Sequence, residues 1–166
     1  IPANTTNTYL GTFGGPWAYE DNLTLVKHGA GILVLSNSST YGVATVINQG
    51  TVIAKGTNAL GTAAGLTIEA NALLTIQTTN GAISDTALVN LKTGGGYGHI
   101  YLTSGLVEVV DCLFSNGSPV FCGTWGATGS GCEYTNDNFF SGSGILYVLN
   151  NAAMIWDATT GNGQPD

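Results

Sequence analysis

Two histidines, His28 and His99, are the side chains best suited to acid–base catalysis near neutral pH. They lie in separate short apolar segments, and no Gly-x-Ser-x-Gly motif follows such a segment to supply a serine nucleophile. The acids Glu108 and Asp111 follow His99, but strand alternation places them on opposite faces, unlike the paired carboxylates of a glycosidase. We therefore expect no catalytic residue and a protein that is not an enzyme.

Three cysteines, Cys112, Cys122 and Cys132, are the other reactive side chains. None has a CxxC partner or a nearby histidine, so the sequence predicts no metal site and no cofactor. Cys122 and Cys132 flank a glycine-rich connection that can bring two strands together, which makes them the best disulfide pair in an oxidising compartment. The alternative is three buried thiols that behave as small apolar side chains.

Aromatic side chains beside glycines suggest a different chemistry, the stacking of planar rings on sugars. Trp17, Tyr97 and Trp125 are the candidates for carbohydrate contact if their rings are exposed. The alternative is that these rings pack in the core and in turns.

Four sequons fit the pattern Asn-x-Ser/Thr without proline, at Asn4, Asn22, Asn37 and Asn116. They predict glycosylation if the chain is exported by a route that carries the transferase.

The charge balance excludes several classes of protein. The 166 residues include 3 Lys+Arg and 10 Asp+Glu, a formal net charge of -7, and only 8% are charged whereas 43% are hydrophobic. Three scattered lysines (Lys27, Lys55, Lys92) cannot neutralise a nucleic-acid backbone, so no nucleic acid is expected as a partner. No apolar run approaches the roughly 20 residues of a membrane-spanning helix. The remaining class is a secreted β-protein with a Thr-, Asn-, Ser- and Gly-rich surface.

These residues must be positioned by strands, because no window keeps an apolar stripe of helical period. Short β-branched segments bounded by Gly, Asn or Ser recur along the chain. Five of them share a small residue followed by alternating apolar positions, starting at Gly31, Gly50, Ala72, Gly105 and Gly144. The intervals between these copies lengthen, whereas a strict β-helix keeps its period. We therefore predict an all-β, two-sheet β-sandwich of jelly-roll type with solenoid-like strand repeats, and a short right-handed β-helix is the alternative.

Two longer stretches carry a family resemblance. The first joins Gly29-Ala-Gly-Ile-Leu-Val-Leu-Ser-Asn-Ser-Ser-Thr-Tyr41, Ala44-Thr-Val-Ile-Asn-Gln-Gly-Thr-Val-Ile-Ala54 and Ala59-Leu-Gly-Thr62. The second runs from Val110 to Val148 and includes Gly123-Thr-Trp-Gly-Ala-Thr-Gly-Ser-Gly131. Together they resemble the autotransporter-associated β-strand repeat of bacterial surface proteins and its closing segment. This resemblance implies a secreted or surface-displayed, non-enzymatic β-protein of structural or adhesive type.

The two ends lie outside this resemblance, which divides the chain into an N-terminal tail (1–22), a β-domain (23–148) and a C-terminal tail (149–166). Each tail has a few large apolar residues among extended-prone Thr and Asn. An open edge strand can accept such a segment from a second copy, and head-to-tail exchange then builds a filament. The candidate assembly residues are Ile1, Tyr9, Leu10, Phe13, Met154 and Trp156; the alternative is that they cover their own core.

These observations predict an extracellular, non-enzymatic structural protein, a subunit of a self-assembling fibre or surface appendage held by β-strand contacts between copies. The alternative is a monomeric adhesin or carbohydrate-binding domain of a bacterial surface protein, with glycans as partners.

Overall fold

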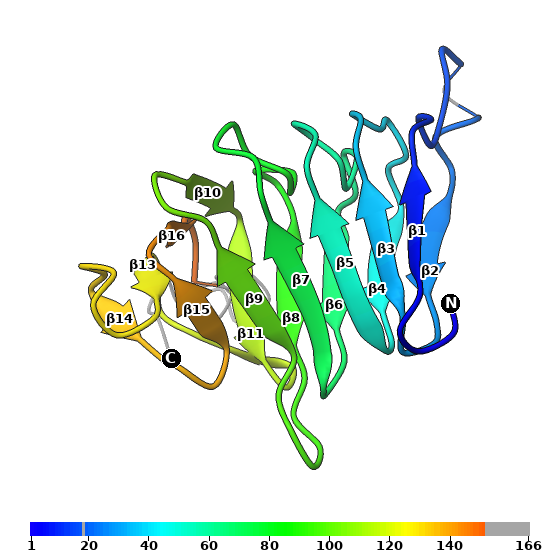
Figure 1. Cartoon of the computed structure of the whole chain (residues 1–166). Helices are drawn as coiled ribbons and strands as arrows, with labels where there is room; N and C mark the ends of the chain where they lie inside the picture. Colours follow the sequence, from blue (N-terminus) through cyan, green and yellow to red (C-terminus); the bar gives the residue numbers. More distant parts are fainter. Residues whose placement is uncertain (18, 152–166) are drawn as a thin grey trace.

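The computed structural model describes residues 1–17 and 19–151, and within them every regular element is a β-strand (Figure 1). The strands are β1 (Thr6–Tyr9), β2 (Thr24–Lys27), β3 (Ile32–Leu35), β4 (Ala44–Ile47), β5 (Gly50–Ala54), β6 (Gly65–Ile68), β7 (Ala72–Ile76), β8 (Leu88–Leu91), β9 (His99–Leu102), β10 (Val107–Val110), β11 (Cys112–Ser115), β12 (Ser118–Pro119), β13 (Gly123–Gly126), β14 (Tyr134–Thr135), β15 (Phe140–Gly142) and β16 (Ile145–Val148). The all-β prediction is confirmed.

Consecutive strands alternate between two long sheets. One sheet has the order β1-β3-β5-β7-β9-β15 and the other the order β12-β11-β8-β6-β4-β2. Apart from the antiparallel β11–β12 pair, the pairing within both sheets is parallel. Each coil of the chain therefore adds one strand to each sheet, and the coils stack side by side from β1 and β2 toward β15 in Figure 1. The architecture is a β-solenoid.

The two-sheet sandwich is not confirmed, because a third sheet is present and the strands pair as in a β-helix. The lengthening intervals that favoured the sandwich are absorbed by the turns. Ile32 pairs with Thr51, Thr51 with Leu73 and Leu73 with His99, so the register persists while the spacing grows. Residues 77–87, between β7 and β8, hold one such insertion outside the sheets. Coils can stack as long as the strand residues repeat. A longer turn adds little to the entropic free-energy cost of closing the loop between two strands.

Register places apolar side chains in ladders between the two sheets. Pairing aligns the buried residues Val52, Leu74, Ile100 and Phe140 in one sheet, and Ile47, Ile68 and Leu91 in the other. Alternation in each strand turns every second side chain inward, so the ladders form a continuous core. Lys27 occupies the next position of the second ladder, beside Ile47.

The N-terminal end of the core is closed by side chains of the first coil. Lys27 is buried, and its Nζ donates to the carbonyls of Gly29 at 2.5 Å and Gln49 at 2.9 Å. Burial lowers the pKa of this lysine. On the other side, the rings of Tyr9 and Phe13 stack at 4.2 Å and Phe13 meets the buried Tyr41 edge-on.

At the other end, a third sheet of order β10-β16-β13-β14 is added to the solenoid. β10 and β16 pair in parallel, whereas β16 and β13 pair antiparallel. β13 and β14 pair in parallel across a glycine-rich connection, in which Gly129 and Gly131 have φ of 87° and 82°. The closing segment seen in the sequence therefore contributes β11, β12 and β15 to the long sheets and β13, β14 and β16 to the third sheet.

Close contact between coils makes Gly50 a critical position. Its φ is 71°, and an added Cβ would lie 2.5 Å from the Gly31 carbonyl oxygen and 2.7 Å from that of Gly29. Gly95 has a similar φ of 73°, but an added Cβ there would meet nothing within 4 Å. Comparison of Gly50 with Gly95 therefore distinguishes the effect of backbone conformation on stability from the effect of packing between coils.

We predict that Gly50→Ala destabilises the fold more than Gly95→Ala, as measured by the free energy of unfolding in denaturant. Gly95→Ala should cost about 1 kcal/mol because it forces alanine into the left-handed region. Gly50→Ala should cost at least about 2 kcal/mol more, since backbone atoms of the preceding coil must also move. Equal losses would contradict close stacking at this corner.

Candidate functional site

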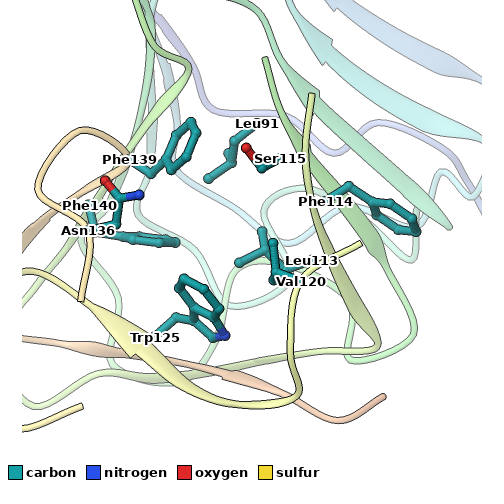
Figure 2. Close-up of a pocket in the computed structure, with 9 residues that line it drawn as sticks. All are labelled: Leu91, Leu113, Phe114, Ser115, Val120, Trp125, Asn136, Phe139 and Phe140. Atoms are coloured by element: carbon teal, nitrogen blue, oxygen red, sulfur yellow. The ribbon is translucent and has the colours of Figure 1, made fainter. Parts of the chain in front are cut away.

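A small apolar pocket lies beside the third sheet. Its volume is about 100 Å³, and it lies between the β11–β12 pair, β13 and the segment leading into β15. Figure 2 shows the Trp125 ring at one wall and Phe139 and Phe140 at another. The lining residues are Leu91, Leu113, Phe114, Ser115, Val120, Trp125, Asn136, Phe139 and Phe140. With two polar side chains, Ser115 and Asn136, and no titratable group in its wall, the pocket has no means for acid–base chemistry.

Trp125, a predicted sugar-stacking residue, forms part of a ring stack beside this pocket. Its ring lies 4.8 Å from that of Tyr134, which in turn lies 5.9 Å from the exposed ring of Phe121. The indole N–H donates to the Phe121 carbonyl at 2.9 Å. One face of Trp125 is thus occupied by Tyr134, and the side chain packs against the core. These contacts favour a packing role for Trp125.

The other two aromatic candidates are more open to solvent. Trp17 is 61% exposed and Tyr97 is 43% exposed, with the Tyr97 ring edge-on to Phe139 at 5.5 Å. The turn that carries Trp17 is held by Glu20, whose Oε2 accepts from the Trp17 backbone N–H and whose own N–H donates to the Trp17 carbonyl. The three candidates therefore do not form one platform: two belong to separate exposed turns and the third is packed.

The N-terminal end of the solenoid presents two edge strands, β1 and β2. Ile32 donates its N–H to the Thr5 carbonyl, and Ser36 donates its N–H to the Tyr9 carbonyl. The backbone N–H and C=O groups of the odd-numbered residues of β1 therefore point toward β3. Backbone groups alternate in direction along a strand, so Thr6 and Thr8 direct their N–H and C=O groups away from the sheet. No strand among residues 1–17 and 19–151 pairs with β1 on this side, so an added strand can pair with these groups.

The assembly candidates occupy different positions around this edge. Leu10 is 69% exposed, whereas Tyr9 and Phe13 are half-buried against the core. Ile1 is half-buried, and its ammonium group donates to the His28 carbonyl at 2.8 Å. The tail assigned to residues 1–22 thus supplies β1 to its own chain, and β1 and β2 belong to one coil. Met154 and Trp156 lie outside the described residues.

The cysteines differ in accessibility, and no disulfide joins them within the described residues. Cys122 is exposed, Cys132 half-buried and Cys112 buried. Cys122 directly precedes β13 and Cys132 precedes β14 by two residues, and these two strands pair in parallel. Their oxidation to a disulfide stays a prediction.

We predict that a maleimide reagent labels the folded, reduced protein in the order Cys122, Cys132, Cys112, because thiol access sets the rate. Mass spectrometry of digested samples at increasing times gives the order. Under air oxidation, loss of labelling at both Cys122 and Cys132, with a mass decrease of two hydrogens, would demonstrate the pair; the Cys122→Ser variant is the control that cannot form it.

The histidines and the acid pair are far from a catalytic arrangement. His28 contacts the Asn48 side chain, whereas His99 contacts the Asn138 carbonyl and the Ser141 hydroxyl. Asp111 accepts a hydrogen bond from the Asn150 side chain at 2.5 Å. Glu108 is fully buried and accepts hydrogen bonds from the N–H groups of Ala82 and Ile83. None of these four side chains contacts another.

Glu108 is a buried acid to which the sequence analysis assigned no role. Alternation in the segment Leu106-Val-Glu-Val-Val110 places residue 108 on the same face as Leu106 and Val110, both of which are buried. An acid on an inward face is the signal that would have identified it.

All four sequon asparagines are exposed. Asn4 and Asn116 lie in turns with φ of 59° and 53°, and Asn22 precedes β2. Asn37 donates its side-chain N–H to the Leu10 carbonyl, a bond that an attached glycan would disturb. Glycosylation at each site stays a prediction.

Within the described part of the chain, no group of three or more His, Cys, Asp and Glu side chains is arranged to hold a metal. The same residues contain no helix long and apolar enough to cross a membrane.

Comparison with known families ties this geometry to a repeat. The model of the passenger-associated transport repeat matches residues 25–54. The chain carries this repeat. The match spans nearly all of β2 and the whole of β3, β4 and β5, so the repeat unit contains strands from both sheets of successive coils.

The repeat confirms the resemblance drawn from residues 29–54. No curated protein and no solved structure matches the chain. At a coarse level, the repeat implies a surface or secreted bacterial protein.

Proposed function

We propose that the protein is a non-enzymatic structural element of the bacterial surface whose copies associate through β-strand contacts into a fibre or appendage. The observation that carries this proposal is the pair of edge strands, β1 and β2, at one end of the solenoid. A parallel solenoid transmits load along its backbone ladders and needs no cofactor.

The composition of β1 supports strand pairing. Its sequence is Thr-Asn-Thr-Tyr, without charge and without proline, and its first three residues are exposed. Natural edge strands are usually protected by lysine, proline or a covering segment. The neighbouring patch is apolar, since Leu10, Leu23 and Val26 are 69%, 46% and 44% exposed. An added strand would gain both backbone hydrogen bonds and apolar contact.

The opposite end offers a complementary edge for head-to-tail contact. β10 is an edge strand of the third sheet, and its first residue, Val107, is 55% exposed. The other edge strands at that end are protected or short: β12 contains Pro119, the Phe140 N–H in β15 donates to the Asn136 carbonyl at 2.9 Å, and β14 has only 2 residues. Pairing of β1 with β10 of a second copy therefore joins the two unprotected edges and extends without closing.

We predict that Thr8→Pro abolishes association while leaving the fold intact, since proline removes an N–H that points away from β3. Thr8→Val keeps that N–H and is the matched control. Sedimentation velocity and negative-stain electron microscopy across protein concentrations give the readout, with circular dichroism as the check on folding. Wild-type protein that stays monomeric throughout, or Thr8→Pro protein that assembles as wild type does, would sink the proposal.

A second candidate function is carbohydrate contact by an adhesin-like surface. The exposure of Trp17 and Tyr97 favours it, because an open ring face can stack on a sugar. Each ring alone supplies a weak contact, so binding would depend on multivalent display along an assembled surface.

We predict that Trp17→Ala lowers glycan retention on an array about fivefold, since one stacking ring contributes about 1 kcal/mol. Trp125→Phe, which keeps an aromatic ring in the packed stack, should leave retention unchanged. Equal retention by Trp17→Ala and wild type would remove Trp17 from this role.

A further inference from the structure

Glu108 joins the third sheet to the connection between β7 and β8 (residues 77–87). Its carboxylate, on β10, accepts the N–H of Ala82 at 3.0 Å and that of Ile83 at 2.7 Å. Glu108 and Ala82 have no exposed surface, and Ile83 is 3% exposed. The acid therefore supplies the acceptor that two buried N–H groups need.

The connection is also tied to the preceding coil. Asn58 donates its N–H to the Gly81 carbonyl and Leu60 to the Ala82 carbonyl, each at 3.0 Å. Ser39 in turn donates to the Asn58 carbonyl at 3.0 Å. Turns of three successive coils thus lie in one chain of hydrogen bonds that ends at Glu108. Loss of the Glu108 contact would leave the Gly81 and Ala82 carbonyls bonded to the preceding coil but detach the Ala82 and Ile83 N–H groups from β10.

No cation offsets the charge of Glu108. The charged group that acts on it from the connection is Asp85, which is also an acid, and β16 places the uncharged Leu146 opposite it. Asp111, at the end of β10, is engaged with Asn150. Burial of the carboxyl, opposed by the two N–H bonds and reinforced by Asp85, raises the pKa of Glu108 from its ordinary value of 4.5 to about 7.

We propose that Glu108 is a pH-dependent clasp, which holds the 77–87 connection against β10 when protonated and releases it when ionised. A buried carboxylate without a cation gains free energy by reaching water, and only opening of the connection allows that. A protonated carboxyl keeps an oxygen that accepts both N–H bonds, so the closed state loses nothing on protonation.

The direction of the pH effect follows from proton binding. The closed state binds the proton more tightly than the open state, so the clasp is fully formed below about pH 4.5 and weakens as the pH rises through about 7. Between about pH 5 and about pH 8, the open fraction should increase on the order of fiftyfold. Local opening of this kind is visible in amide exchange while the rest of the core stays protected.

The test is hydrogen exchange at the Ala82 and Ile83 amides of the full chain, compared with Glu108→Gln at each pH to cancel intrinsic exchange rates. Glutamine keeps an acceptor oxygen and cannot ionise. The ratio of wild-type to Glu108→Gln exchange should rise at least tenfold from about pH 5 to about pH 8. Glu133→Gln, at an exposed acid, is the control and should behave as wild type.

A ratio that does not change with pH would overturn the clasp, as would a Glu133→Gln variant that abolishes the pH response. Asp85→Asn tests the same idea in case Glu108→Gln fails to fold. Removal of the Asp85 charge lowers the pKa of Glu108 in the closed state, so the rise in exchange at Ala82 and Ile83 should level off at a lower pH and be smaller than in the wild-type protein. A rise as large as that of the wild-type protein would count against the proposal.

Discussion

Parallel backbone hydrogen bonding between successive coils is the interaction on which the rest of this structure depends. The ladders fix the register of strands such as β3, β5, β7 and β9, and that register aligns the inward side chains into a continuous core. Each coil needs its neighbour, because a single coil buries too little apolar surface to offset the entropy of ordering it. The close approach at Gly50 belongs to the same constraint, since coils at ladder distance leave no room for a side chain at that corner.

At each end of a solenoid, the last strands have no neighbour on one side, and the core has no further coil to cover it. At the N-terminal end, the core is closed by Lys27 and by the Tyr9–Phe13 ring pair, yet the outer backbone groups of β1 have no neighbouring strand among the described residues. Core closure and edge closure are therefore separate properties. The first excludes water from the apolar interior, whereas the second decides whether another chain can add to the sheet. This separation makes strand-mediated association compatible with a stable single copy.

The turns differ from coil to coil in length and sequence, whereas the paired strands keep one register. The connections between strands differ in length, and two features of chemical interest, the Trp17 turn and the 77–87 connection, lie outside the long ladders. In the 77–87 connection, the N–H groups of Ala82 and Ile83 donate to the ionisable side chain of Glu108 rather than to a neighbouring strand. The hydrogen bonding of this turn therefore involves a group whose charge depends on pH. The strands of the two long sheets contain no acid, and their basic side chains are Lys27, at the end of β2, and His99, at the start of β9.

The sequence by itself determined the secondary structure, the inward positions and the repeat. Alternation in segments such as residues 50–54 and 72–76 requires strands with one buried face, and residues 29–54 carry the signature of a surface-protein repeat. Only the tertiary structure decided between sandwich and solenoid. The same alternation suits both, and the choice depends on whether a strand pairs with its sequence neighbour or with the strand one coil away, which spacing did not reveal because turns absorb the insertions. It also separated the packed Trp125 from the exposed Trp17 and turned Glu108 inward, since exposure depends on which distant segments cover a residue.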